Sequence, residues 1–360
     1  MKVVEIGGIG PGPFATMTLA DMGADVIRID RRDGQSAFPG DPRDDLLNRG
    51  KRSIELDLKS PDDVETALRL IDGADVVVEG FRPGVVERLG LGPETCLERN
   101  PRLVYGRMTG WGQDGPWAQH VGHDINYIAV TGALDAIGRA GEAPTIPLNL
   151  VGDYGGGGMY LVTGVLAALL EVAASGVGQV VDAAIADGAA HLLTGTHAMM
   201  AAGSWVPERG ENVLDGAAPH YNVYATADGK YMAVGAIEPQ FYRDLLGRLE
   251  LDVDPKLQNT REEWPALRDR ISAIFASRTL KEWEDVFDGS MACTSSVRSL
   301  LDAEHHPQLA ARGTLVKRDG RLQAAPAPRF SRTPTELSSP PPAPGQHSDE
   351  ILAELLDQAE

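Results

Sequence analysis

Cysteine is almost absent from this chain. Only Cys96 and Cys293 occur among 360 residues, and neither stands in a C-x-x-C pair or beside a histidine-rich stretch. Two distant cysteines neither form the disulfide framework of a small secreted domain nor match the ligand spacing of a zinc or iron–sulfur site. We therefore expect both to be reduced structural thiols, and we expect no metal site.

Positive charge is also scarce. The chain has 33 lysines and arginines against 52 aspartates and glutamates, a net charge of −19 with a pI near 4.8. This balance disfavours a nucleic-acid-binding role, because a polyanion is then attracted only by a local cluster of cations. The hydrophobic content of 42% is that of a globular protein, and the length predicts one large or two smaller domains.

Signals for export or membrane insertion are not apparent. Strand-like sequence starts at Lys2, so no signal peptide is expected. The most apolar predicted helix, residues 159–174, contains Glu171 and is shorter than the roughly 20 residues that cross a bilayer. We expect a cytoplasmic protein with neither a membrane nor a nucleic acid as partner.

The first hundred residues alternate between apolar runs and helical patterns. Alternation of this kind predicts a parallel sheet flanked by helices. Ser60 and Pro61 mark the start of one helix as N-cap and first helical residue. The expected strands are residues 3–6, 25–29, 53–58, 74–79 and 103–108, and the expected helices are residues 14–22 and 61–72.

The remaining sequence predicts a second, smaller domain. A helix over 159–174, a strand over 179–184 and a helix over 185–202 complete the first part, and residues 220–310 read as α+β. There, Asp228-Gly229 is a hairpin signal between strands at 221–226 and 230–234. Three helices are expected near residues 239–249, 264–277 and 280–287. The expected division is a large α/β domain over 1–200, a linker over 201–220, a small domain over 221–310 and a C-terminal segment over 311–360, with residues 324–345 extended.

Two glycine-flanked motifs carry acid–base side chains. One contains His123 and Asp124 between Gly122 and Tyr127, and the other places Asp153 before four consecutive glycines. Histidine and aspartate transfer protons readily, and glycines let backbone N–H groups approach a ligand. The motifs predict proton transfer at a carbon acid whose oxyanion is held by amides. The alternative is a core histidine and a helix-capping aspartate.

A third motif, residues 10–15, fits the dinucleotide-binding pattern G-x-G-x-x-A, and Asp30 ends the next predicted strand. The pattern works through backbone N–H groups that cradle a pyrophosphate, and Pro11 and Pro13 have none. Arg31 and Arg32 would suit a phosphate, so NADP stays open as an alternative. We regard nicotinamide chemistry as the weaker interpretation.

The chain resembles the family III CoA-transferase superfamily over most of its length, with a weaker match at about residues 250–320. Members of this superfamily are interlocked homodimers with a Rossmann-like large domain that binds CoA, a smaller α+β domain and a C-terminal segment that returns to the large domain. The thioester supplies the acidity, so no cofactor beyond the CoA of the substrate is implied. The resemblance rests on the two glycine-flanked motifs and on residues 4–13, 24–31, 48–53, 56–59, 79–84, 87–90, 108–113 and 235–242.

His123 decides between the two branches of the superfamily. The transferases place a nucleophilic aspartate where Asp153 stands, whereas the racemases use it as one base and add a histidine at the position of His123. The resemblance therefore implies a racemase that interconverts (R)- and (S)-2-methylacyl-CoA by 1,1-proton transfer through an enolate. The alternative is a CoA transferase in which Asp153 is the nucleophile and His123 is structural.

The resemblance also implies roles for further residues. Glu238 would be the partner of His123, and the alternative is a plain acid at a helix N-terminus. The enolate oxygen needs hydrogen-bond donors in place, for which the Asp124 N–H is the first candidate and the glycine run the second. The acyl group itself is not readable from the sequence. The residues implied to contact CoA or the substrate are Arg31, Leu56, Asp57, Leu58, Lys59, Gly80, Phe81, Arg82, Arg88, Gly122, Ile125, Asn126 and Tyr127.

Overall fold

The computed structural model of the chain describes residues 1–32 and 40–357 and contains two compact units. The first unit combines Met1–Thr131, Leu148–Leu193 and the chain from Ala310 on, and the second combines Gly132–Pro147 and Thr194–Leu309. These bounds differ from the predicted ones, because the second unit takes residues 132–147 and starts at 194 without a separate linker. The segment from Ala310 on belongs to the first unit.

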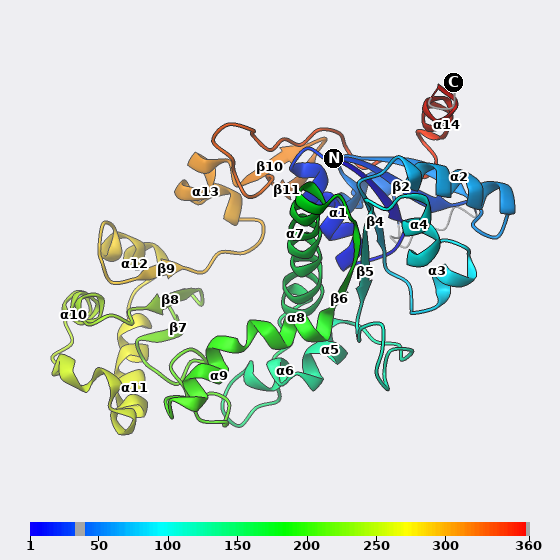
Figure 1. Cartoon of the computed structure of the whole chain (residues 1–360). Coiled ribbons are helices and arrows are strands. Elements are labelled where there is room, and N and C mark those ends of the chain that lie inside the picture. The colour runs from blue at the N-terminus through cyan, green and yellow to red at the C-terminus, as the bar shows by residue number, and fades with distance from the viewer. Residues whose placement is uncertain (33–39, 358–360) are drawn as a thin grey trace. The chain divides into compact units, whose positions relative to one another are not determined.

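A six-stranded parallel sheet forms the centre of the first unit, as Figure 1 shows. Its order is β3-β2-β1-β4-β5-β6, with all neighbours parallel. The strands are rich in β-branched residues because helices cover both faces of the sheet. Their bounds are β1 (Lys2–Ile6), β2 (Asp25–Arg31), β3 (Lys51–Leu56), β4 (Val76–Glu79), β5 (Val104–Thr109) and β6 (Gln179–Ala184).

Alternate residues of each strand enter different cores. Val3 and Val78 belong to one buried cluster, and Val4 and Val77 to the other. The first cluster includes residues of α1 (Pro11–Asp21) and α7 (Met159–Ser175). The second includes residues of α2 (Pro61–Asp72), α4 (Pro93–Arg99) and the C-terminal α14 (Ser348–Asp357). The predicted parallel sheet flanked by helices is thus confirmed.

The most apolar helix is longer than the sequence predicted. The glycine run is itself helical: η3 (Leu150–Gly158) is a π-helix that continues into α7. The combined 26 residues are long and apolar enough to cross a membrane by length and composition alone, so the prediction that this segment is too short is wrong. In the structure Leu161 and Val165 of this helix are fully buried in the core against the sheet.

The predicted helix over 185–202 is two helices. They are α8 (Ile185–Leu192) and α9 (Thr194–Ala201), separated at Leu193, where the chain passes from the first unit to the second. Thr194, Gly195 and Thr196 follow the break, and both threonine and glycine have low helix propensity. The further helical elements of the first unit are η1 (Pro42–Asp44), η2 (Leu46–Asn48), α3 (Val85–Arg88) and α5 (Asp124–Val130).

The second unit is α+β around its own aromatic core, in which Tyr242, Phe275 and Trp283 are buried. Its antiparallel sheet has the order β7-β8-β9, and Gly229 takes φ +71° in the predicted hairpin turn. The elements are α6 (Ala133–Ala136), β7 (Tyr221–Ala225), β8 (Tyr231–Gly235), α10 (Pro239–Arg248), η4 (Pro255–Asn259), η5 (Arg261–Glu263), α11 (Trp264–Phe275), α12 (Leu280–Phe287), β9 (Thr294–Ser296) and η6 (Ala303–His305).

The C-terminal segment attaches to the edge strand β3. After α13 (Pro307–Arg312), the hairpin of β10 (Leu315–Arg318) and β11 (Arg321–Ala324) leads into a stretch without helix or strand up to α14. Gly345 donates its N–H to Ser53 Oγ at 2.8 Å, and Ser53 donates its own N–H to His347 Nδ1 at 3.1 Å. The tail thereby covers the outer edge of the sheet.

Candidate functional site

A cavity of about 860 Å³ lies at the carboxyl ends of β1, β4 and β5, within the first unit. Parallel α/β sheets bind their ligands at this edge, because the connecting loops and helix N-termini converge there. The walls come from residues 8–13 after β1, residues 80–83 after β4, residues 109–111 at the end of β5, residues 120–123 before α5, residues 126–130 of α5 except Ile128, and Asp153 of η3. The two glycine-flanked motifs thus meet in one cavity.

His123 stands at the N-terminus of α5, as its N-cap, with extended backbone. Its N–H donates to Asn126 Oδ1 at 3.0 Å, and its carbonyl accepts from the Asn126 N–H at 2.8 Å. These two bonds fix the backbone of His123, while its side chain is exposed and lines the cavity. An imidazole carried by this fixed backbone at the cavity wall can reach a bound substrate and exchange a proton with it.

Asp153 brings the second acid–base group to the cavity. Asn149, one turn earlier, donates from Nδ2 to Asp153 Oδ2 at 3.3 Å, and a Cβ placed on Gly10 would lie 3.5 Å from the same oxygen. Burial raises the pKa of the Asp153 carboxyl, and the nearby Asp124 carboxylate raises it further, against the lowering effects of Asn149 and His123. A carboxyl with a raised pKa is a stronger base when ionised.

Asp124 links the two motifs by a hydrogen bond. Its carboxylate is buried, and Oδ2 accepts the backbone N–H of Asp153 at 2.7 Å. Since Asp124 directly follows His123 in the chain, this bond fixes the distance between the backbones that carry the two acid–base groups. The other oxygen, Oδ1, is buried without a hydrogen-bond partner among the residues that the structure describes.

Gly152 lets the two motifs approach this closely. A Cβ at position 152 would lie 2.4 Å from Asp124 Oδ2, so the Gly152→Ala variant must displace the carboxylate that holds Asp153. We expect a loss of activity of up to about a hundredfold and a destabilisation of about 1–3 kcal/mol, measured by kinetics and urea unfolding. Gly247→Ala in α10, where a Cβ meets nothing within 4 Å, is the control and should keep full activity. Wild-type activity in Gly152→Ala would show that the close approach is unimportant.

Tyr127 shapes the wall between the two motifs. Its hydroxyl donates to the Gly122 carbonyl at 2.5 Å, and its ring meets Trp111 edge-on with centroids 4.8 Å apart. Burial raises the pKa of this hydroxyl, and Asp153 adds to the effect. A Cβ on Gly110 would lie 2.1 Å from the ring, so this glycine makes room for it. Tyr127 thus lines the cavity, belongs to the buried core beside it and donates its hydroxyl hydrogen to the backbone, and its predicted contact with the substrate stays a prediction.

The residues predicted to contact CoA fall into two groups. Gly80, Phe81 and Arg82 line the cavity, as do Gly122, Asn126 and Tyr127, and the Phe81 N–H is held by Glu79 Oε2 at 2.7 Å. Ile125 lies on α5 but not among the lining residues described. Also outside that lining are Arg31, Leu56, Asp57, Leu58, Lys59 and Arg88.

These outer residues still lie on the same edge of the sheet or next to it. Arg31 and Leu56 are register partners at the carboxyl ends of β2 and β3. Lys59 donates its N–H to Asp57 Oδ1 at 3.1 Å in the turn that follows β3, and Arg88 ends α3 beyond β4. Their contact with CoA stays a prediction.

Glu238 lies in the second unit. It is the N-cap residue of α10, its side chain is exposed, and its carbonyl accepts the N–H groups of Phe241 and Tyr242 at 3.0 Å each. This placement fits the simpler interpretation of a residue at a helix N-terminus. The predicted partnership of Glu238 with His123 stays a prediction.

Sequence reasoning missed several residues of the cavity. Trp111 and Trp117 line it and pack edge-on at 4.9 Å, and Asn149 holds the Asp153 carboxylate. The signal for Trp111 was its place between glycines directly after β5, whereas nothing local marks Asn149. Residues 8–13, which include the first four residues of the motif weighed above for a dinucleotide, form one wall.

No group of three or more His, Cys, Asp or Glu side chains that could hold a metal ion occurs among residues 1–32 and 40–357. Within the same ranges Cys96 and Cys293 are free thiols, the former buried and the latter exposed. The prediction that the site needs no metal or separate cofactor is not tested by these observations.

Comparison with known proteins places this arrangement in a family. The family model for CoA-transferase family III matches residues 1–348. Over 357 residues the chain is 44% identical to the alpha-methylacyl-CoA racemase of Mus musculus, covering 98% of this chain and 92% of that protein. The protein of the same name from Homo sapiens is 43% identical over 359 residues, with 99% and 92% covered. The crystal structure of a CAIB/BAIF family protein from Brucella suis superimposes with a TM-score of 0.82 at 27% identity, covering 99% of this chain and 98% of that one.

Proposed function

The chain belongs to CoA-transferase family III, and we propose that it is an isomerase of that family, a racemase that interconverts (R)- and (S)-2-methylacyl-CoA thioesters. The observation that carries the proposal is the presence of His123 and Asp153 in one cavity, with their backbones joined through Asp124. The extent of the similarity to two proteins named as racemases supports it.

The reaction needs two acid–base groups. The α-hydrogen of an acyl thioester is acidic because its loss gives an enolate that is delocalised onto the thioester oxygen. Inversion at that carbon requires one group to remove the proton from one face and another to return a proton to the opposite face. One group must therefore start as a base and the other as an acid, and their roles exchange with the hand of the substrate.

His123 and Asp153 take these two roles in our proposal. For one enantiomer, His123 removes the α-proton and the protonated Asp153 carboxyl delivers a proton to the other face. For the other enantiomer, the Asp153 carboxylate removes the proton and the His123 imidazolium returns one. The raised pKa of Asp153 supports this assignment, because it brings the basicity of the carboxylate closer to that of an imidazole.

The enolate oxygen needs a hydrogen-bond donor that is already in place. We assign this role to the N–H of Asp124, because it belongs to the first turn of α5, where N–H groups have no acceptor within the helix. The buried Asp124 carboxylate also holds Asp153 at 2.7 Å, so one residue would orient both parts of the site. The amides of the glycine run are the second candidate for the oxyanion donor.

The carboxyl edge of the sheet is the proposed path for CoA. Arg82 lines the cavity, and beyond it Arg31 ends β2, Lys59 lies in the turn after β3 and Arg88 ends α3. Guanidinium and ammonium groups at this edge would bind the phosphates of CoA in a protein that is otherwise strongly acidic. An interlocked homodimer and a pairing of Glu238 with His123 belong to the same proposal.

NMR in D₂O with (S)-2-methylacyl-CoA and no acceptor acid tests the function. We expect deuterium at C2 together with the (R) epimer, because the second group returns a solvent-derived proton to the opposite face. The competing function is that of a CoA transferase with Asp153 as nucleophile. It would be indicated by no exchange in this experiment, but transfer of CoA once a carboxylic acid is added.

A further inference from the structure

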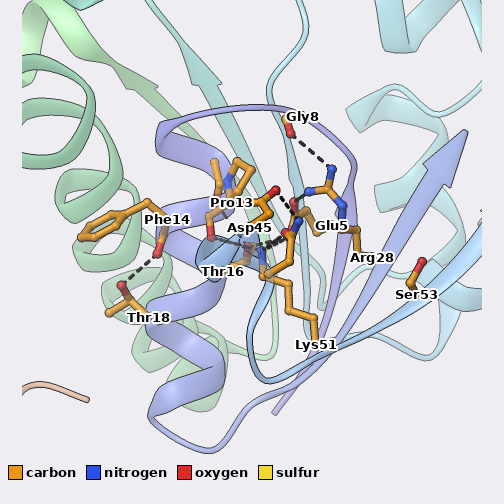
Figure 2. A network of polar contacts seen from close by, with 12 residues as sticks. Glu5, Gly8, Pro13, Phe14, Thr16, Thr18, Arg28, Asp45, Lys51 and Ser53 are labelled. Carbon is orange, nitrogen blue, oxygen red and sulfur yellow. Dashed lines mark hydrogen bonds and ion pairs between the residues drawn. The ribbon is translucent and has the colours of Figure 1, made fainter. Parts of the chain in front are cut away.

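Three charged residues are buried beneath the loop that forms one wall of the cavity. Glu5 of β1, Arg28 of β2 and Lys51 of β3 have side chains exposed by only 1%, 10% and 0%. We call residues 8–13 the loop: they are the turn after β1 and the first three residues of α1. Figure 2 shows the charged residues gathered beside this segment, near Gly8 and Pro13. Apolar residues of similar volume are often as stable as a buried ion pair or more so. Stability alone therefore does not explain three charges at this place.

The two cations reach backbone carbonyls of the loop. Lys51 Nζ donates to the Pro13 carbonyl at 3.1 Å, and Arg28 Nη2 donates to the Gly8 carbonyl at 3.3 Å (Figure 2). Glu5 is the counter-ion of both, since it pairs with Lys51 Nζ at 2.7 Å and with the Arg28 guanidinium. Thr16 of α1 completes the cluster by donating from Oγ1 to Glu5 Oε2 at 2.6 Å.

The loop offers few backbone N–H groups for hydrogen bonds of its own. Pro11 and Pro13 lack an N–H, Gly10 takes φ +71°, and α1 begins without a side-chain cap. Phe14 still donates its N–H to the Gly10 carbonyl at 3.1 Å, and Lys51 and Arg28 of the sheet add bonds to the Pro13 and Gly8 carbonyls. The loop in turn faces Asp153, because a Cβ on Gly10 would lie 3.5 Å from the Asp153 carboxylate.

We propose that Lys51 is a positioning residue that holds the loop of residues 8–13 against the Asp153 side of the cavity, through the Pro13 carbonyl and Glu5. The effect on catalysis rests on the proposed function, whereas the effect on the loop does not. Because His123 is carried by α5, which Lys51 does not contact in the bonds described, its side of the reaction should be affected less.

The charge state of the cluster agrees with this role. Burial lowers the pKa of Lys51 to about 8 despite the attraction of Glu5. Burial alone would raise the pKa of Glu5, but Lys51 and Arg28 outweigh it and bring that pKa to about 2. The pair is thus ionised at pH 7, with Asp45 as a further carboxylate acting on Lys51 and Asp30 on Arg28. An ionised ammonium gives the stronger, charge-assisted bond to the loop carbonyl.

The test compares Lys51→Met with Arg49→Met. The Arg49 side chain is 7% exposed and forms a pair with Asp21, also buried, at the far end of α1. Its remaining bonds go to Gln323 and Ala324, and none of these partners lines the cavity. The two variants therefore each break one buried ion pair, but only Lys51→Met releases the loop.

Deuterium exchange at C2 is measured from each enantiomer separately. The enantiomer that Asp153 deprotonates is identified as the one whose exchange is lost in Asp153→Asn. Lys51→Met should slow exchange of that enantiomer by about ten- to a hundredfold, as expected for displacement of a catalytic group by up to 1 Å. Exchange of the other enantiomer should fall less, and Arg49→Met should leave both rates near those of the wild type. Equal losses for both enantiomers in Lys51→Met would overturn the proposal.

Amide hydrogen exchange of the peptide that covers residues 7–14 gives a second readout that needs no substrate. Faster exchange there in Lys51→Met than in Arg49→Met supports the proposal even if the wild type does not epimerise any 2-methylacyl-CoA, an outcome that would refute only the proposed function. Equal exchange in the two variants refutes the role of Lys51. If Lys51→Met does not fold, Lys51→Gln, which keeps an N–H donor without the charge, is compared with Arg49→Met by the same two criteria.

Discussion

Asp153→Asn is expected to abolish epimerisation, with a loss of about a thousandfold or more, while one enantiomer still exchanges its α-proton with solvent. Asparagine has nearly the shape of aspartate but is not a base at neutral pH. The enantiomer that Asp153 deprotonates should become inert. The other is still deprotonated by His123, which exchanges its proton with water and returns a deuteron to the same face. NMR at C2 and chiral analysis of the hydrolysed acid distinguish exchange from inversion.

Asp187→Asn is the matched control for this variant. Asp187 lies in the first turn of α8, is exposed and does not line the cavity, so the same chemical change should leave both activities intact. In the wild type, the acid limb of kcat/KM for the enantiomer deprotonated by Asp153 should lie above the ordinary range of aspartate, because burial raises the pKa of this carboxyl. Retained epimerisation in Asp153→Asn would eliminate Asp153 as an acid–base group.

His123→Gln should give the corresponding result for the opposite enantiomer. Epimerisation should again fall by about a thousandfold or more, and exchange should persist only for the enantiomer that was inert in Asp153→Asn. The backbone at position 123 should keep its conformation, because its N–H and carbonyl are both bonded to Asn126. The measurement is the same pair of NMR and chiral assays.

His120→Gln is the control, since His120 also lines the cavity but packs against Trp117, with ring centroids 5.3 Å apart. It should keep epimerisation.

The His123→Gln and Asp153→Asn variants also distinguish a racemase from a CoA transferase. If the protein is a transferase in which His123 is structural, His123→Gln will retain CoA transfer to a carboxylic acid while Asp153→Asn loses it. Loss of exchange for the same enantiomer in both variants would contradict a mechanism with one base on each face.

Much of the fold of the first unit followed from local pattern. The bounds of α2 and β6 agree with those predicted. An N-cap residue followed by proline marks the start of α2, and a short apolar run marks β6, so both signals lie within a few residues of sequence. The helix α5 was not predicted, since its seven residues are too few to show a period. The π-helix η3 was not predicted either, because glycine disfavours helices and only the packing of α1 and α8 around it stabilises that backbone.

The chemical groups of the site and their order along the chain follow from local sequence. His123 and Asp153 were both identified from glycine-flanked motifs, because acid–base side chains in such surroundings need no tertiary information to be noticed. The hydrogen bonds that hold these groups depend on contacts between distant parts of the chain. The bond from Asp153 to Asp124 joins residues 29 positions apart, and the bond from Lys51 to Pro13 joins residues 38 positions apart. Neither spacing matches the period of a helix or a strand, so neither bond could be predicted from local sequence. Both bonds form because folding buries the charged side chains, and a buried charge without a hydrogen-bond partner is costly.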